Sequence, residues 1–155
     1  MSTFLVGIST WLHTLATVVM VGHYVFASLV YLPTFESRFK GAALRELLEG
    51  TSARLRPFFG GSLLIFIVTG THLMLINENY MGLGDFFGSS WSTLIIVKHV
   101  LVLAFIALAV LSERIFVPQI SEQKPEALKR FRLSLAANLI LGVLILLLTT
   151  IAQSV

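Results

Sequence analysis

Four long apolar stretches dominate the pattern of hydrophobic and polar positions along this chain of 155 residues. They cover about residues 4–32, 58–76, 92–115 and 133–152, and the connections between them are short. Each stretch reaches the ~20 residues that a helix needs to cross a hydrocarbon core of ~30 Å. The pattern therefore predicts an all-α membrane protein, in which residues 1–155 form a single domain, an up-down bundle of four transmembrane helices.

Two prolines mark predicted helix ends. Pro33 follows the first stretch, and the residue before a proline disfavours helical backbone, so we expect the first helix to end there. Pro57 falls at the first turn of the second predicted helix, where its missing N–H costs little. Between the two, residues 42–56 place leucines among charged residues, which predicts a short helix that is either interfacial or a solvated connector.

The basic residues predict the orientation of the bundle. The connection after residue 76 has no Lys or Arg and is bracketed by Tyr80 and Trp91, aromatic residues typical of a membrane interface. The positive-inside rule then places the other two connections in the cytoplasm, and both termini and the Gly-rich loop Met81–Ser90 outside. The basic residues of the two cytoplasmic connections are Arg38, Lys40, Arg45, Arg54, Arg56, Arg114, Lys124, Lys129, Arg130 and Arg132.

Composition narrows the chemistry. Only 12% of the residues are charged, against about 25% in soluble domains. There is no cysteine, which excludes disulfides, iron–sulfur clusters, thiolate metal sites and covalent attachment of haem. The net charge of +3 is explained by the topology of the basic loops, so we expect no nucleic-acid partner.

All four histidines, His13, His23, His72 and His99, lie inside the predicted spans. A polar side chain in hydrocarbon is costly, and imidazole is well suited to bind haem iron or copper. At ~1.5 Å per residue, His13, His72 and His99 lie ~6–9 Å from the bilayer centre on the outer side, and His23 lies ~6 Å on the other side. We therefore expect the histidines to bind haem b, either one or two, or copper. The alternative for each histidine is a hydrogen bond between helices.

Other polar residues of the spans have two interpretations each. Lys98 either pairs with a haem propionate or substrate carboxylate, or extends to the outer surface; an ideal helix places it on a different face from His99. Asn138 either hydrogen-bonds a ligand histidine or links helices. Small residues such as Gly70 and Gly142 either make room for a porphyrin or let helices approach closely. Threonines near the histidines, including Thr69, are expected to bond back to their own helix.

The first and third spans carry a family resemblance. Leu12-His13, Gly22 and Tyr31-Leu32-Pro33 resemble the first helix of the HemJ-type membrane protoporphyrinogen oxidases. The third span, with Trp91 followed by Lys98, looks like the lysine-bearing helix of that family.

The last span has a second resemblance. Asn138, Gly142 and Thr149 are similar to the last helix of CopD, the copper-resistance membrane domain, which shares the same architecture. The family resemblance implies a haem b protein in which His13 is a haem ligand and Lys98 is a functional partner. We expect a multi-pass protein of the bacterial inner membrane, whose termini the positive-inside rule places in the periplasm. One departure is Thr34, which stands where the oxidase pattern has Arg.

The leading hypothesis is a haem b protein that transfers electrons between a quinol and a redox partner, on its own or as a subunit of an oligomer or larger membrane complex. The alternatives are CopD-like copper binding or transport, a HemJ-type oxidase in which Lys98 is the candidate catalytic residue, and a structural subunit. Whether the chain is an enzyme is left open.

Overall fold

The computed structural model describes residues 2–80, 82, 88–121 and 124–153. Residues 81 and 83–87, and with them most of the predicted Gly-rich loop, lie outside this set. The described chain is all-helical, and the four helical segments Thr3–Arg38, Gly41–Leu75, Ser90–Gln119 and Pro125–Ala152 are long and apolar enough to cross a membrane. The predicted set of four spans is confirmed.

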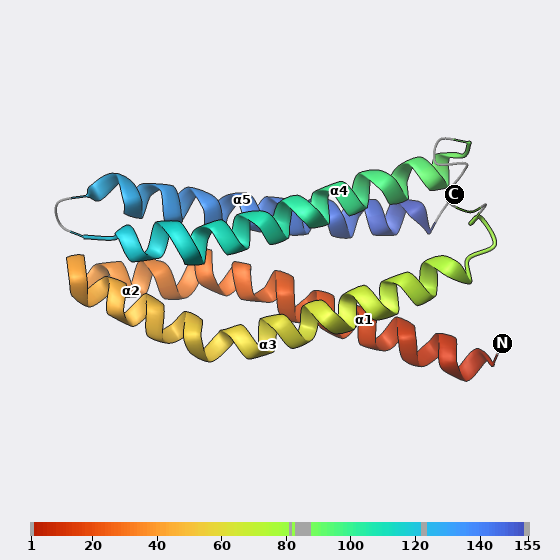
Figure 1. The fold of residues 1–155 in the computed structure, drawn as a ribbon, viewed down its shortest axis with the longest axis horizontal. Helices are drawn as coiled ribbons and strands as arrows, with labels where there is room; N and C mark the ends of the chain where they lie inside the picture. The colour runs from red at the N-terminus through yellow and green to blue at the C-terminus, as the bar shows by residue number, and fades with distance from the viewer. Residues whose placement is uncertain (1, 81, 83–87, 122–123, 154–155) are drawn as a thin grey trace.

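The four segments run up and down along one common direction (Figure 1). The start of α1 (Thr3–Phe26), the end of α3 (Gly41–Leu75), the start of α4 (Ser90–Leu111) and the end of α5 (Pro125–Ala152) lie together at what we call the terminal end. The opposite end, which we call the basic end, carries α2 (Leu32–Arg38), the start of α3 and the start of α5. The up-down arrangement is thus as predicted, and it places the basic connections together.

The prediction that the first membrane helix ends at Pro33 is wrong. The helix continues through α2 to Arg38. A π-helical turn, Ala27–Tyr31, precedes the proline, and the Leu32 N–H donates to the Ala27 carbonyl five residues back. Proline lacks an N–H, and its ring clashes with the carbonyl four residues back in an α-helix. The wider π-turn accommodates the ring, so the helix passes the proline instead of ending.

The same arrangement recurs at the end of α4. The π-helical turn Ser112–Phe116 lies just before Pro118, and the Val117 N–H donates to the Ser112 carbonyl. A short 3₁₀ turn, Val117–Gln119, then ends the segment. Each π-turn therefore has the same cause, a proline two residues beyond it.

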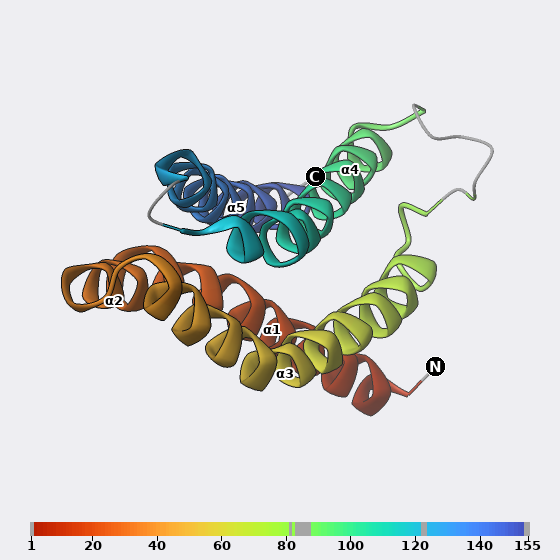
Figure 2. The same cartoon turned by 60° about the vertical axis from the view of Figure 1, so that its left-hand side comes forward.

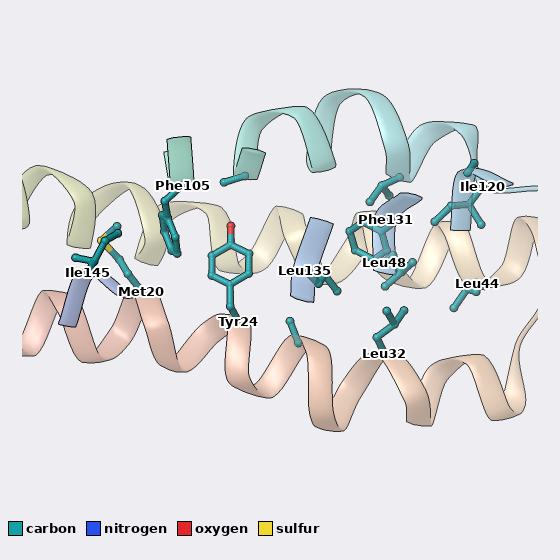
Figure 3. Close-up of a cluster of buried hydrophobic side chains, with 14 residues drawn as sticks. Met20, Tyr24, Leu32, Leu44, Leu48, Phe105, Ile120, Phe131, Leu135 and Ile145 are labelled. Carbon is teal, nitrogen blue, oxygen red and sulfur yellow. The ribbon is translucent and has the colours of Figure 1, made fainter. Parts of the chain in front are cut away.

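The second membrane helix also begins earlier than predicted. α3 is continuous over 35 residues, and Pro57 lies inside it, not at its first turn. The predicted short helix over 42–56 is its first half. Leu44 and Leu48 are buried in the same hydrophobic cluster as Leu32 and Ile120 (Figure 3). This half of α3 therefore packs into the bundle at the basic end.

Two helix pairs make up the bundle. α1 packs along α3, α4 packs along α5, and the contact of α1 with α5 joins the pairs. Gly142 permits that contact, because a Cβ there would lie 3.1 Å from Cγ2 of Val21. Figure 2 shows α3 and α4 diverging toward the terminal end. The bundle is therefore closely packed along α1 and α5 and opens between α3 and α4.

Ion pairs join the two helix pairs at the basic end. Arg132 of α5 donates to a carboxylate oxygen of Glu36 in α2 at 2.7 Å, and Arg56 of α3 lies 3.5 Å from Glu113 in the second π-turn. These side chains are largely solvent-exposed, apart from Glu36, so each pair contributes about 0–1 kcal/mol to stability. Buried apolar side chains of all four membrane helices also pack together at this end, among them Leu32, Leu48, Ile120 and Phe131 (Figure 3).

Gly142→Leu should destabilise the protein by about 1–3 kcal/mol, because the new side chain must displace Val21 and separate α1 from α5. Gly60→Leu is the matched control, since a Cβ at Gly60 meets nothing within 4 Å. Reversible unfolding in mixed micelles, followed by circular dichroism, measures both changes. Equal effects of the two substitutions would contradict the close approach of α1 and α5.

Candidate functional site

A cavity of about 570 Å³ opens between α3 and α4 toward the terminal end. All four membrane helices line it, and most of its wall is apolar. Its volume falls in the ~300–1,000 Å³ range of small-molecule and cofactor sites. The lining side chains with metal-binding or charged groups are His13 of α1, Met74 of α3, and Lys98 and His99 of α4.

Residues of α3 position the His13 side chain. The His13 ring stacks on Phe66 with ring centroids 4.4 Å apart, and its Nδ1 lies 3.0 Å from Oγ1 of Thr69. Gly70 leaves room for the ring, because a Cβ at Gly70 would lie 2.9 Å from Cε1 of His13. Three residues within five positions of one helix therefore fix the orientation of the His13 imidazole.

The bond to Thr69 defines which nitrogen of His13 carries the proton. Thr69 Oγ1 lies 2.6 Å from the Ile65 carbonyl, so its single hydroxyl hydrogen is donated there. Oγ1 can then only accept from His13, and the proton of neutral His13 must be on Nδ1. This arrangement leaves the Nε2 lone pair available as a metal ligand.

His99 reaches the same tautomer through a different partner. Its Nδ1 lies 2.7 Å from the carbonyl oxygen of Ile95, one turn earlier in α4. A carbonyl can only accept, so Nδ1 of His99 donates and the Nε2 of the neutral ring has a free lone pair. The cavity is thus lined by two imidazoles that are both held in the tautomer suited to binding a metal.

Lys98 also lines the cavity and is half-buried. An ideal helix places Lys98 and His99 on different faces, yet both line the cavity, because the cavity covers a broad arc of α4, from Trp91 to Ile106. Among the described residues that line the cavity there is no Asp or Glu. Lys98 therefore contributes a positive charge that no lining carboxylate balances.

His72 is not among the cavity-lining residues. Its Nδ1 is buried without a hydrogen-bond partner, and the cavity-lining residues of α3, such as Gly70 and Met74, lie on another face of the helix. Within the described chain, no three His, Asp or Glu side chains come together as a metal-binding group. A shared depth therefore did not make His13, His72 and His99 a set of three ligands, because their helical faces differ.

His23 lies apart from the cavity, among aromatic rings. Its ring centroid is 5.0 Å from that of Tyr24, 6.2 Å from that of Tyr31 and 6.1 Å from that of Phe59. Asn138 is fully buried, and neither atom of its amide group has a hydrogen-bond partner, so the expected bond to a ligand histidine is absent. A role for His23 or Asn138 in cofactor binding stays a prediction.

Sequence reasoning missed several residues of the site. Trp91, expected at the membrane interface, is buried and lines the cavity. Thr69, expected only to bond back to its own helix, does so and also holds His13. The signal available for Phe66, Thr69 and Gly70 was their spacing of three and four residues, which places them on one face of α3.

Thr69→Val should weaken the preference of His13 for a single tautomer, because valine removes the Oγ1 acceptor while nearly preserving shape, and only the backbone of Phe66 remains as a partner. ¹⁵N NMR of labelled protein in nanodiscs reports the protonation of each ring nitrogen. The wild-type spectrum should show an Nδ1–H signal for His13 and for His99, and the substitution should change His13 alone. Thr71→Val, in the same helix and cavity wall, is the control. An Nε2–H tautomer of wild-type His13 would contradict the assignment.

The family model described as Copper resistance protein D, CopD, matches residues 49–152, more than half of the chain. No curated protein matches the chain. No solved structure matches it either. The matched stretch includes Lys98 and His99, while His13 precedes it. The predicted resemblance to CopD is thus confirmed, and the chain belongs to the Copper resistance protein D family.

Proposed function

We propose that this membrane protein binds copper in the cavity at the terminal end, with His13 and His99 as ligands. The single observation that carries the proposal is that both imidazoles have the same tautomer. Each ring donates its Nδ1 proton to an oxygen atom held by a helix. Each neutral ring therefore presents Nε2 to a ligand. The name of the family, Copper resistance protein D, supports copper as that ligand.

The donor types in the cavity suit copper. Imidazole binds copper in either common oxidation state, and a thioether favours Cu(I). Met74 brings a thioether sulfur to the same cavity wall. We therefore propose that Met74 completes the ligand set with His13 and His99, which favours the reduced ion. His72 is not part of this set.

The distribution of basic residues between the two ends of the bundle indicates the side of the membrane from which copper enters. Ten of the eleven basic residues belong to connections at the basic end, and the exception is Lys98. The positive-inside rule assigns that end to the cytoplasm. We therefore propose that the cavity faces the periplasm of a bacterial inner membrane, and that copper reaches it from outside the cell.

His13→Ala and His99→Ala should each weaken Cu(I) binding at least about tenfold, which corresponds to about 1.4 kcal/mol. Each change removes one nitrogen ligand from the cavity. A competition titration with a chromophoric Cu(I) chelator, using protein in nanodiscs, measures the affinity. His72→Ala is the matched control and should leave affinity unchanged. Loss of affinity in the control but not in His13→Ala would overturn the ligand assignment.

Lys98 favours a second candidate, haem b. The cavity is largely apolar, and its one lysine faces no carboxylate among the described lining residues. These features fit a flat apolar molecule with an anionic group, and imidazole is an axial ligand of haem iron. In this alternative, Lys98 pairs with a propionate and the protein transfers electrons.

Lys98→Gln distinguishes copper from haem, because it should change the two binding affinities in opposite directions. A lysine ammonium repels a copper ion, by about 2 kcal/mol for unit charges ~8 Å apart at an effective dielectric constant of ~20. The substitution should therefore tighten Cu(I) binding, and Lys124→Gln at the basic end should not. Haem binding, measured by visible absorption during titration, should instead weaken when Lys98 loses its charge. Weaker copper binding in Lys98→Gln would contradict the copper proposal.

A further inference from the structure

The exposed apolar surface of the bundle ends at one level toward the basic end. The last exposed apolar side chains before that end are Val30 of the first π-turn, Phe58 of α3, Ile115 of the second π-turn and Leu133 of α5. Among the described residues of 31–57 and 117–132, Phe39 is the only large apolar side chain that is exposed. Because apolar side chains on the outside of a membrane protein face lipid, the lipid-facing surface ends at this level.

The bundle continues beyond that level with a different surface. α3 begins at Gly41, so the part of it before Phe58 is about 25 Å long at ~1.5 Å per residue. Leu44 and Leu48 of this part are buried in the hydrophobic cluster (Figure 3). Helices that bury an apolar face and expose polar residues are typical of a water-soluble bundle. The boundary between lipid and water therefore crosses the protein where the exposed apolar residues end.

Five arginines lie at this boundary, and we call them the arginine collar. They are Arg54 and Arg56 of α3, Arg114 of the second π-turn, and Arg130 and Arg132 of α5. Two contacts align the helices here, the ion pair of Arg56 with Glu113 and the hydrogen bond from Ser112 to Ser134. Counted from these contacts at ~1.5 Å per residue, the five arginines fall within about 5 Å of one level along the bundle.

Two members of the collar are paired inside the protein. Arg56 pairs with Glu113 and Arg132 pairs with Glu36, and both ion pairs connect the two helix pairs of the bundle. Because an α-helix turns ~100° per residue, a residue two positions away points about 200° around the helix. Arg54 and Arg130 each lie two positions from a paired arginine, so they point away from the neighbouring helix pair.

The other three members, Arg54, Arg114 and Arg130, are exposed and have no carboxylate partner in the described part of the chain. The five positive charges of the collar are met by only the two carboxylates of Glu36 and Glu113. Three unbalanced positive charges therefore surround the bundle at the membrane boundary.

We propose that Arg54, Arg114 and Arg130 bind the phosphate groups of anionic phospholipids at the membrane surface. A guanidinium group presents its N–H donors in a planar fork, which fits two phosphate oxygens at once. The three side chains extend outward at the level of the lipid headgroups, where the opposite charge is supplied by lipid and not by protein. This lipid site lies at the other end of the bundle from the copper cavity and does not depend on it.

Native mass spectrometry tests the proposal with protein in detergent, to which phosphatidylglycerol or phosphatidylcholine is added at equal concentration. The wild-type protein should bind phosphatidylglycerol at least about fivefold more tightly, since each basic residue near an anionic surface contributes roughly that factor. A protein that combines Arg54→Gln, Arg114→Gln and Arg130→Gln should lose this preference. No preference in the wild-type protein would overturn the proposal, as would displacement of the bound lipid by inorganic phosphate at constant ionic strength.

A second triple variant controls for net charge. Arg38→Gln, Lys40→Gln and Lys124→Gln together remove the same three charges, but these residues lie beyond the collar, farther from the lipid-facing surface. This variant should keep the preference for phosphatidylglycerol. Equal loss of preference in both triple variants would show that net charge alone attracts the lipid, and would overturn the assignment to the collar.

Two single cysteines in α3 test the level of the membrane boundary, because the chain has no cysteine of its own. Gly50 and Gly60 are both exposed, and a Cβ at either position meets nothing within 4 Å. They lie on opposite sides of the boundary. In nanodiscs, Gly50→Cys should react readily with a water-soluble maleimide, and Gly60→Cys should react only after unfolding. Equal reactivity in the folded protein would contradict a membrane surface at the collar.

Discussion

The contact between α1 and α5 is the interaction on which the rest of this structure depends. α3 packs mainly on α1 and α4 mainly on α5, so this one contact, together with the packing at the basic end, holds the two pairs together. The absence of a side chain at Gly142 sets how closely the helices approach. Because α3 and α4 are not tied to each other in this way, they can diverge and leave a cavity at the terminal end.

The copper proposal depends on α3 acting as a scaffold for a side chain of α1. Phe66, Thr69 and Gly70 together hold the His13 ring, and the carbonyl of Ile95 holds His99 in the equivalent tautomer. Neither ring must move a proton from Nε2 to Nδ1 before it binds a metal at Nε2. The positive charge of Lys98 repels a cation in the same cavity. The affinity for copper therefore depends mainly on how far the ligand bonds outweigh this repulsion.

The bundle could be predicted from sequence because a membrane span needs length and apolarity, which are visible residue by residue. Helix ends were harder to predict. Pro33 follows a π-turn that lets the first membrane helix continue, and Pro57 lies inside the continuous helix α3. Depth placed His13, His72 and His99 at one level, but it could not show that His72 is not among the residues that line the cavity, because depth says nothing about helical face. The burial of Asn138 beside Tyr24 depends on contacts across helices, which no local pattern reports.

X-ray absorption at the copper edge tests the central claim most directly, because it reports the atoms bound to the metal. Protein in nanodiscs loaded with one equivalent of Cu(I) should show scattering from two imidazole rings and a sulfur shell from one thioether. His99→Ala should remove one imidazole contribution and leave the sulfur. A spectrum with oxygen ligands and no imidazole scattering would contradict copper binding by His13 and His99.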